Sequence, residues 1–384
     1  MKFQALVLVS CVLFYLTVQA AEAPITQSDE MNYWSPPNFV LRNTNAIGYD
    51  SGSFETPAAL EKDVQFWIDI YSKYTTQQGV FHLSGHTDQV LGQIDLRDIY
   101  SNQKWSAIRR ELEAGIIVRR QKRFIAKKWG IKNLASIRLQ MGLKDRMQEA
   151  IKLSGLYLPM IERIFTDQNL PLELSRVAFV ESSFNIHAGS KVGASGLWQI
   201  MPRVARQFKY INPTYDKRNH PYYSTLVAAR ILKQNYQILK SWPLAITAYN
   251  HGVGSLKKIV TKYKSNDIGF LVDNVKAKKS FGFASRNFYA TFLAALHVEK
   301  NANLYFAEPI EKLPELMLRD FYLKKKIRFE TLVKLFDGDR SKIKLYNAHI
   351  SAKYMKNGRW IPEKTLISLP SDGKPRLAEM VQAK

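Results

Sequence analysis

The sequence is almost without cysteine, and this limits its chemistry. Cys11 is the only cysteine among 384 residues. It lies in an N-terminal segment that we predict to be removed, so we expect the mature protein to have no disulfide, no thiol nucleophile and no cysteine-ligated metal. Two histidines, His82 and His86, lie four residues apart, but Ser84 and Gly85 between them interrupt any helix. We therefore expect no metal site there, and no cofactor.

Long apolar runs are also scarce, since the only marked one lies at the N-terminus. A single lysine precedes an apolar run over residues 5–18, and small residues that suit a cleavage site follow it. This pattern predicts a signal peptide over residues 1–23, because the run is too short to span a membrane comfortably. The residues Leu-Val-Ser-Cys that end at Cys11 also fit a lipoprotein box, but the apolar run continues beyond it. We therefore predict an exported, soluble protein rather than one anchored through a lipid on Cys11.

Acidic side chains are outnumbered throughout the chain. The 33 Asp and Glu residues face 56 Lys and Arg residues, which leaves a net charge of +23. Such an excess predicts an acidic partner. Because the chain is predicted to be exported, we do not expect nucleic acid to be that partner. An anionic wall polymer or an anionic membrane surface fits the charge, and the sequence predicts no particular oligomeric state.

The most basic stretch is a long helical pattern from Asn102 to Trp129. Apolar side chains recur along one side of it, at Trp105, Ile108, Leu112 and Ile116. Two interpretations stay open for the basic residues of this helix. They form either an ordinary solvated surface or a dock for an acidic wall polymer.

The most informative stretch runs over residues 171–202. Pro171 suits the first turn of a helix. An apolar face with one acid then recurs at helical spacing, at Leu174, Val177, Ala178 and Glu181. A carboxylate on such a face is costly unless it is paired or protonated, and burial raises its pKa toward the value that a general acid needs. Glu181 is therefore the candidate catalytic residue, with a structural salt bridge as the alternative and Glu173 as the second candidate acid.

A loop rich in Ser, Gly, Ala and Asn follows, over residues 182–196. Its three glycines allow the backbone to approach a ligand closely. The loop leads into Trp198 and Gln199, which bring an aromatic and an amide side chain together. An aromatic face with a few placed polar groups is typical of a sugar-binding cleft.

Three motifs occur in one order along the chain. The first is Glu-Ser-x-Phe-Asn at 181–185, the second is Ala-Gly-Ser through Gly-Leu-Trp-Gln-Ile-Met-Pro at 188–202, and the third is Ala-Tyr-Asn-x-Gly at 248–252. Together they resemble the catalytic core of family 1 lytic transglycosylases, the lysozyme-like enzymes that cleave the glycan strands of bacterial peptidoglycan. The resemblance covers about residues 143–306 and is greatest to the membrane-bound lytic murein transglycosylase D type. It implies a mainly α, lysozyme-like α+β fold and a place in the periplasm or cell envelope.

The resemblance also implies a mechanism with one acid. Glu181 would protonate the oxygen between N-acetylmuramic acid and N-acetylglucosamine, while the substrate's own N-acetyl oxygen stabilises the sugar cation. Glu181 would then take the proton of the muramyl C6 hydroxyl as that oxygen closes a 1,6-anhydro ring. Many relatives carry a second Glu where this chain has Ala284. The residues implied to bind the substrate are Ser190, Gln199, Tyr249 and Asn250.

The predicted segments are a signal peptide at 1–23, an N-terminal helical region at 24–140, a catalytic domain at 141–308 and a small module at 318–372. Inside the catalytic domain we expect two short helices over residues 143–168, joined near Gly155, and a polar stretch at 209–222 that crosses the surface. The order strand, helix, helix, strand in the last segment resembles a single LysM module, a β-α-α-β fold that binds N-acetylglucosamine polymers. A structural tail is the alternative.

Two other functions remain open. A muramidase of goose-lysozyme type would share the fold and the acid but would add water to the cleaved bond. A wall-binding protein could keep the fold without activity. The candidate site residues, all of the types that the family uses, argue against the second of these.

Overall fold

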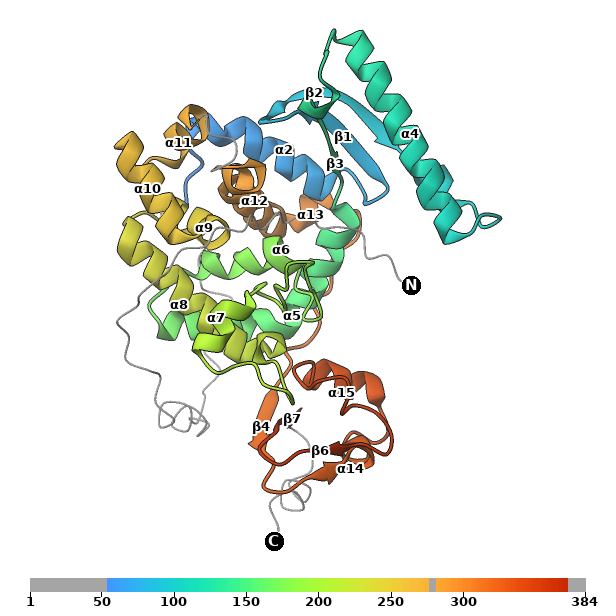
Figure 1. The fold of residues 1–384 in the computed structure, drawn as a ribbon, viewed down its shortest axis with the longest axis vertical. Helices are drawn as coiled ribbons and strands as arrows, with labels where there is room; N and C mark the ends of the chain where they lie inside the picture. Colours follow the sequence, from blue (N-terminus) through green and yellow to red (C-terminus); the bar gives the residue numbers. More distant parts are fainter. Residues whose placement is uncertain (1–53, 276–280, 372–384) are drawn as a thin grey trace.

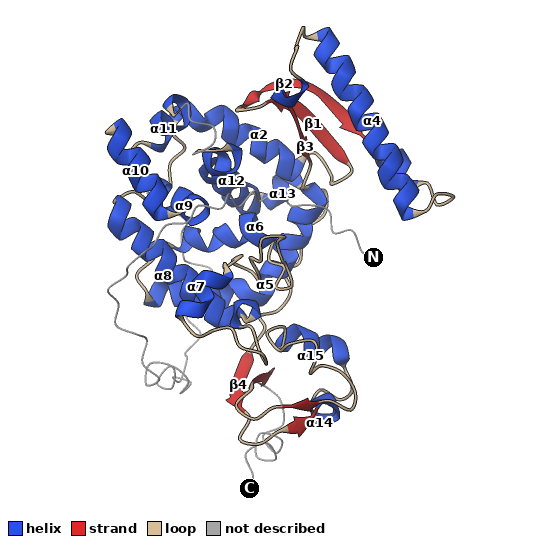
Figure 2. Cartoon of the chain, in the orientation of Figure 1, coloured by secondary structure: helices blue, strands red, loops and turns tan. Residues whose placement is uncertain are grey.

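The computed structural model describes residues 54–275 and 281–371, so the predicted signal peptide lies outside the described residues (Figure 1). Helices dominate this part of the chain, and none of them is long and apolar enough to cross a membrane (Figure 2). They are α2 (Glu61–Ser72), α3 (Arg97–Ser101), α4 (Ala107–Lys128), α5 (Lys144–Asp167), α6 (Val177–Ser182), α7 (Pro202–Gln207), α8 (Pro221–Leu239), α9 (Trp242–His251), α10 (Val253–Tyr263), α11 (Ile268–Asn274), α12 (Phe283–Lys300), α13 (Ala302–Tyr305), α14 (Phe329–Leu335) and α15 (Arg340–Tyr346). The strands are β1 (Gln78–Leu83), β2 (His86–Asp95), β3 (Ile137–Met141), β4 (Leu318–Tyr322), β5 (Ile327–Arg328), β6 (Trp360–Ile361) and β7 (Leu366–Pro370).

The described part of the region 24–140, which we predicted to be helical, contains helices α2, α3 and α4 but also an antiparallel sheet that we did not predict. The strand order is β2–β1–β3, and Val80 in the central strand pairs with Gln93 on one side and Gln140 on the other. The pair Ser84 and Gly85, which interrupts a helical pattern, is the turn between β1 and β2. Gly85 has φ +90°, a conformation that glycine adopts without strain and that tight hairpin turns require.

Helix α4 packs on this sheet and lies at the outer edge of the molecule (Figure 1). Ala114 and Ile125 of α4 join Phe81, Ile94 and Ile137 of the strands in a small core, separate from the main one. The apolar side predicted from Ile108, Leu112 and Ile116 is therefore not the side that packs, because these three side chains are exposed.

Residues 144–167 form the single helix α5, not two short helices as we predicted. Gly155 does not break it. A β-carbon at Gly155 would lie 2.0 Å from the carbonyl oxygen of Leu313, so the glycine lets the segment after α13 cross the helix closely. The glycine that indicated a helix end is thus explained by close packing.

The main core surrounds α6, which lies in the centre of the helical body (Figure 1). The short 3₁₀-helix η4 (Leu172–Arg176) leads into α6, and α12 packs against both. Leu174, Val177 and Ala178 are fully buried, as their helical spacing predicts. The mainly helical fold predicted for this part of the chain is confirmed.

The C-terminal residues 318–370 have the predicted order of strand, helix, helix, strand. β4 and β7 pair antiparallel, with Leu318 opposite Pro370, and the short pair β5–β6 lies between the outer strands in sequence. The LysM likeness of this C-terminal module stays a prediction.

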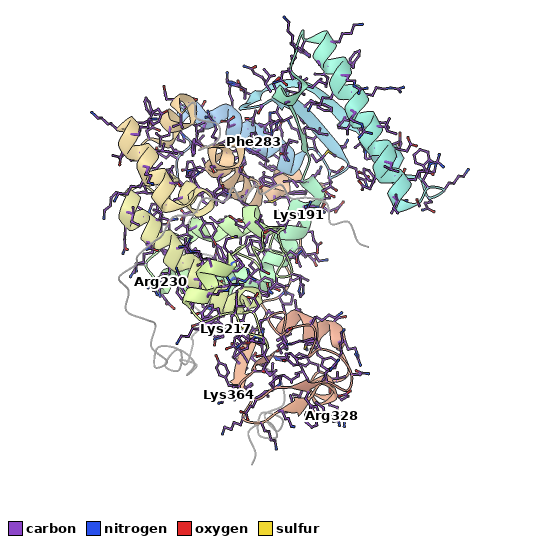
Figure 3. All side chains as sticks on the ribbon, in the orientation of Figure 1. Lys191, Lys217, Arg230, Phe283, Arg328 and Lys364 are labelled. Carbon is purple, nitrogen blue, oxygen red and sulfur yellow. The ribbon has the colours of Figure 1, made fainter. Side chains whose placement is uncertain are left out.

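The polar stretch 209–222 is not a surface crossing, because part of it is buried against the C-terminal module. Lys217 is 3% exposed, and its Nζ lies 3.9 Å from the ring centre of Tyr223 and donates to the Tyr322 hydroxyl at 2.9 Å (Figure 3). His220 Nε2 lies 3.2 Å from a carboxylate oxygen of Asp320. Buried polar contacts therefore tie the module to the helical body.

Candidate active site

Glu181 sits in the last turn of α6 and is 6% exposed. The helix ends directly after it, since Ser183 and Phe184 both have positive φ values, of 53° and 57°. Among the described residues none donates a hydrogen bond to the Glu181 carboxyl or forms an ion pair with it. Burial alone raises its pKa to about 8. The group therefore carries a proton at neutral pH, which is the form that a general acid needs.

Two tyrosines from other helices lie close to Glu181. They are Tyr71 of α2 and Tyr249 of α9, and for both phenols burial and then the Glu181 charge raise the pKa. The Tyr249 hydroxyl donates to the carbonyl oxygen of Trp198 at 2.8 Å, which fixes its ring beside the loop. Helices α2, α6 and α9, which are far apart in the sequence, thus meet at Glu181.

Gln199 braces the loop after α6 from within. Its Nε2 donates to the carbonyl oxygens of Ala188 at 3.1 Å and Gly196 at 2.9 Å, so both amide protons serve the loop. Its backbone has φ +46°, an unusual conformation for a residue other than glycine. The side-chain oxygen remains as the group with which Gln199 can contact a ligand.

Ser190 forms two hydrogen bonds within the same loop. Its Oγ accepts from the backbone N–H of Ala194 at 2.8 Å, and its own N–H donates to the Ala194 carbonyl at 2.9 Å. A hydroxyl that accepts in this way keeps its proton for another acceptor. Ser190 is half-buried at the loop surface, so that proton can reach a ligand.

Trp198 is a core residue and not the open aromatic face that its position suggested. It is fully buried, stacks on Phe165 with ring centres 5.7 Å apart, and donates its indole N–H to Thr225 at 2.9 Å. Gly196 beside it has φ +79°, and a β-carbon there would lie 2.0 Å from the Arg218 carbonyl oxygen. The loop is thus anchored by packing at its end.

Asn250 follows Tyr249 but is turned toward α12. The Ser285 hydroxyl donates to Asn250 Oδ1 at 3.1 Å, and His251 Nδ1 lies 3.0 Å from the same hydroxyl. Since the Ser285 proton is used on Asn250, His251 Nδ1 is the donor in the second bond. Burial lowers the pKa of His251, which keeps it neutral. This chain of side chains lies beside Ala284.

Residues 160–269 match the family described as "Transglycosylase SLT domain". Over this range, 110 residues and less than a third of its length, the chain is similar to a transglycosylase SLT domain. All five predicted site residues fall within the matched range, and the predicted resemblance to lytic transglycosylases is confirmed over this region.

Curated relatives match the same part of the chain. A putative tributyltin chloride resistance protein of Alteromonas sp. (strain M-1) is 34% identical over 128 residues, which are 32% of this chain and 62% of that protein. Membrane-bound lytic murein transglycosylase D of Escherichia coli (strain K12) is 34% identical over 100 residues, 26% of this chain and 22% of that enzyme. The chain thus spans less than two thirds of either relative.

Among solved structures, the 70-kDa soluble lytic transglycosylase of Escherichia coli is 22% identical, with a TM-score of 0.31 over 38% of this chain and 24% of that one. An inactive mutant of the lytic transglycosylase Slt from Pseudomonas aeruginosa is 20% identical, with a TM-score of 0.31 over 40% of this chain and 25% of that one.

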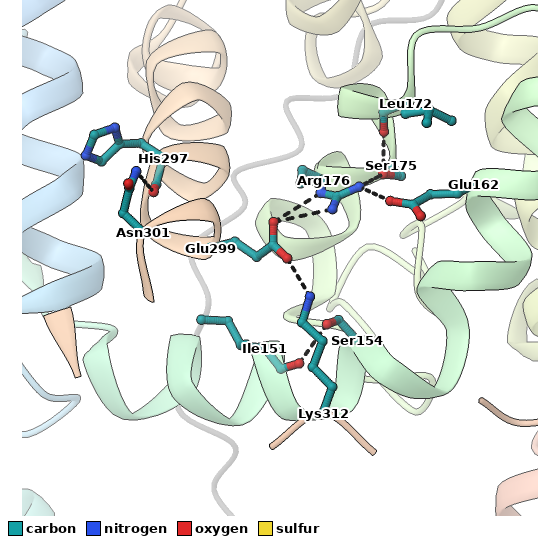
Figure 4. A network of polar contacts seen from close by, with 10 residues as sticks. All are labelled: Ile151, Ser154, Glu162, Leu172, Ser175, Arg176, His297, Glu299, Asn301 and Lys312. Carbon is teal, nitrogen blue, oxygen red and sulfur yellow. Dashed lines mark hydrogen bonds and ion pairs between the residues drawn. The ribbon is translucent and has the colours of Figure 1, made fainter. Parts of the chain in front are cut away.

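A buried ionic network fixes the start of α6 (Figure 4). Arg176 is 1% exposed and forms ion pairs with Glu162 of α5 and with Glu299 of α12, the latter at 3.3 Å. Lys312 Nζ donates to the other Glu299 oxygen at 2.7 Å. Burial alone would raise the pKa of Glu299, but Arg176 and Lys312 hold it below its usual value. Three helices are therefore tied together one turn ahead of Glu181.

The five predicted site residues fall into three groups. Glu181 and Tyr249 are brought together directly, and Ser190 and Gln199 shape the loop that follows the acid. Asn250 stands apart, because it accepts a hydrogen bond from Ser285 of α12. Two further residues of the site, Tyr71 and Ser285, were not identified from the sequence. Tyr71 lies among the buried apolar residues of α2, such as Trp67 and Ile68, and nothing local in the sequence distinguishes it from them.

Proposed function

We propose that the protein is a peptidoglycan lytic transglycosylase that cleaves the β-1,4 bond between N-acetylmuramic acid and N-acetylglucosamine without water. The observation that carries this proposal is the burial of the Glu181 carboxyl, without an ion-pair partner among the described residues, at the head of the loop that contains the second motif. The match to the SLT domain and the identity to a lytic murein transglycosylase support it.

In the first step the Glu181 proton passes to the bridging oxygen as the bond to the muramyl C1 breaks. N-acetylglucosamine leaves with a free hydroxyl, and the muramyl ring carries positive charge that its own N-acetyl oxygen stabilises. In the second step the C6 hydroxyl attacks C1, and its proton returns to Glu181. Atoms balance without water, and because the nucleophile belongs to the same sugar it acts at a high effective concentration.

One feature of the described residues favours this route: the pKa of Glu181 is raised by burial and by no neighbouring acid. Glycosidases that use water or a covalent intermediate normally place two carboxylates on either side of the bond. Among the described residues no charged group contributes to the pKa of Glu181. Ala284 stands where many relatives have a second Glu, and Ser285 next to it serves Asn250. A single acid is enough for an internal nucleophile, because the same carboxyl gives its proton to the leaving oxygen and then accepts the proton of the attacking C6 hydroxyl.

We assign substrate contacts to four further side chains. The Ser190 hydroxyl proton and the Gln199 carbonyl oxygen are the loop groups left for the N-acetyl and sugar hydroxyl groups. Tyr249, fixed to Trp198, orients the sugar at the cleavage point. Asn250 lies next to it and binds the neighbouring sugar.

We propose that the protein acts in the periplasm or cell envelope, because the proposed substrate lies there and residues 1–23 are predicted to be a signal peptide. The partner that we propose is the glycan strand of peptidoglycan. We also propose that the C-terminal module, residues 318–372, is LysM-like and contacts N-acetylglucosamine units of the same strand.

Product analysis tests this function. Isolated sacculi are digested with the protein, and the soluble fragments are analysed by mass spectrometry. We expect muramyl ends in the 1,6-anhydro form, one water lighter than reducing ends. Reducing muramic acid would show hydrolysis and a muramidase instead. Release of no fragment at any pH or salt concentration tried would favour a wall-binding protein without activity.

A further inference from the structure

Helix α4 has two unlike faces. One packs on the sheet through Ala114 and Ile125, which are 4% and 1% exposed. The other faces away from the other described residues, since α4 lies at their outer edge (Figure 1). In a helix that packs on one side only, the outward side is normally polar.

The outward side of α4 instead carries large apolar side chains. Ile108, Leu112, Ile116 and Phe124 are 69%, 62%, 49% and 60% exposed. The first three follow at intervals of four residues, so they form one stripe along the helix. From residue 108 to residue 124 the helix extends roughly 24 Å at about 1.5 Å per residue. Exposed apolar side chains gathered in this way mark an interaction surface.

Basic side chains surround this stripe. Residues 107–128 include eight Lys or Arg and two Glu, a net charge of +6. The exposed ones on or beside the outward side are Arg109, Arg119, Arg120, Arg123, Lys127 and Lys128. We call the apolar stripe and these basic residues together the α4 outer face.

We propose that the α4 outer face docks on an anionic lipid membrane. A helix that lies in a membrane interface needs an apolar side that enters the acyl boundary and Lys or Arg that meet anionic headgroups. The α4 outer face has both features along the same helix. Because the opposite face is held by the sheet, the helix is already formed and loses little conformational entropy on binding.

Two other occupants fit the α4 outer face less well. A wall polymer of sugars and peptides matches the charge, but it offers no acyl layer for Leu112 or Phe124. A second copy of the chain matches the apolar stripe, but it would bring two helices of charge +6 together. Only an anionic lipid surface complements the charge and the stripe at once. This inference is independent of the proposed catalytic activity.

Vesicle flotation tests the proposal. The protein is purified in its exported form, its N-terminus is recorded by intact mass, and it is mixed with phosphatidylcholine vesicles with or without phosphatidylglycerol. We expect binding to the anionic vesicles and weak binding to the neutral ones. Removal of one basic charge from a membrane-facing helix lowers binding about fivefold. The double variant R119Q/R123Q is therefore expected to bind about 25-fold more weakly.

The apolar stripe is tested by the double variant L112S/I116S, for which we expect at least a tenfold loss of binding. The matched controls lie elsewhere on the surface. They are L304S, at the 74% exposed residue of α13, and K257Q/K258Q on α10. Both controls should bind as the wild type does. Thermal midpoints of all variants should agree, because every altered side chain is exposed.

Three results would overturn the proposal. The first is equal binding to neutral and anionic vesicles, and the second is binding that L112S/I116S leaves unchanged. The third is an absence of vesicle binding. In that third case, light scattering that shows a dimer lost in L112S/I116S would assign the α4 outer face to a second copy. Retention on lipid-free sacculi that falls in R119Q/R123Q alone would assign it to the wall polymer.

Discussion

Replacement of Glu181 by Gln tests the site and the cause of its pKa together. The folded protein has a Glu181 pKa of about 8, against 4.5 for the free side chain. Between these values the folded chain keeps a proton that the unfolded chain has lost, so stability is complete below pH 4.5 and falls as the pH rises toward 8. Each pH unit costs about 1.4 kcal/mol, which amounts to about 3 kcal/mol at pH 7.

Gln cannot ionise in either state, so E181Q should remove this loss. We expect no gain in stability near pH 4.5 and a gain of about 3 kcal/mol at pH 7, equivalent to a rise in Tm on the order of 5 °C. Activity should fall by about 10⁴, the upper end for loss of general acid–base catalysis, because one group serves both steps. Tm measured from pH 4.5 to 8 and dye release from labelled sacculi give both quantities.

The matched control is E173Q, which alters a Glu of similar burial in η4, just before α6. It should retain sacculus turnover. Near wild-type turnover of folded E181Q would refute the catalytic assignment, and loss in E173Q instead would move it to that residue. A Tm difference between E181Q and wild type that stays constant with pH would refute burial as the cause of the raised pKa. Burial also raises the pKa of Glu162, to about 7. The stability of both wild type and E181Q therefore falls with rising pH for this second reason, and the difference between the two proteins is unaffected.

Four further changes have defined outcomes. Tyr249→Phe and Ser190→Ala each leave a loop backbone group unpaired, at a cost of about 1–3 kcal/mol; sacculus turnover should fall about tenfold with the products still in the anhydro form, and a switch to reducing ends would contradict their proposed roles. Gly196→Ala places a β-carbon 2.0 Å from a backbone oxygen, so the Tm should fall steeply, and an unchanged Tm would show that the loop can relax. Arg176→Met leaves Glu299 buried with one partner fewer, and denaturant unfolding should record a loss of about 3–5 kcal/mol, whereas a neutral effect would show that the network is not needed for stability.

The helix pattern around Glu181 was predictable because its apolar spacing and its acid lie within eleven residues. The two-helix prediction for residues 144–167 failed because Gly155 also suits a close crossing, and the crossing segment lies more than 150 residues away. The apolar periodicity of α4 correctly predicted that Ile108, Leu112 and Ile116 form one stripe. It could not predict that this stripe faces outward. Which side packs depends on the sheet. The sheet was missed because the largely polar β2 has no regular apolar alternation, and the one clear signal was the turn at Gly85.

Within the candidate site, residue types near Glu181 in sequence were predictable from motifs, and those that arrive from distant helices were not. Tyr71 comes from α2, 110 positions before the acid, and its spacing is that of an ordinary core residue. Trp198 shows the opposite error. Its neighbours suggested an open aromatic face, but its indole is used to hold α8 and α5. Burial decides between these two uses of an aromatic ring, and burial is a property of the whole fold.

The contact between Lys217 and the C-terminal module has a consequence for any attempt to shorten or recombine this chain. The Lys217 ammonium is buried, and one of its partners, the Tyr322 hydroxyl, belongs to the module. His220 depends in the same way on Asp320. A chain cut after residue 308 would leave a cation and an imidazole on a newly exposed aromatic surface, a combination that favours aggregation. A recombinant fragment is thus better designed to include residues up to 371, and a module grafted from another protein would have to supply an acceptor for each of these two side chains.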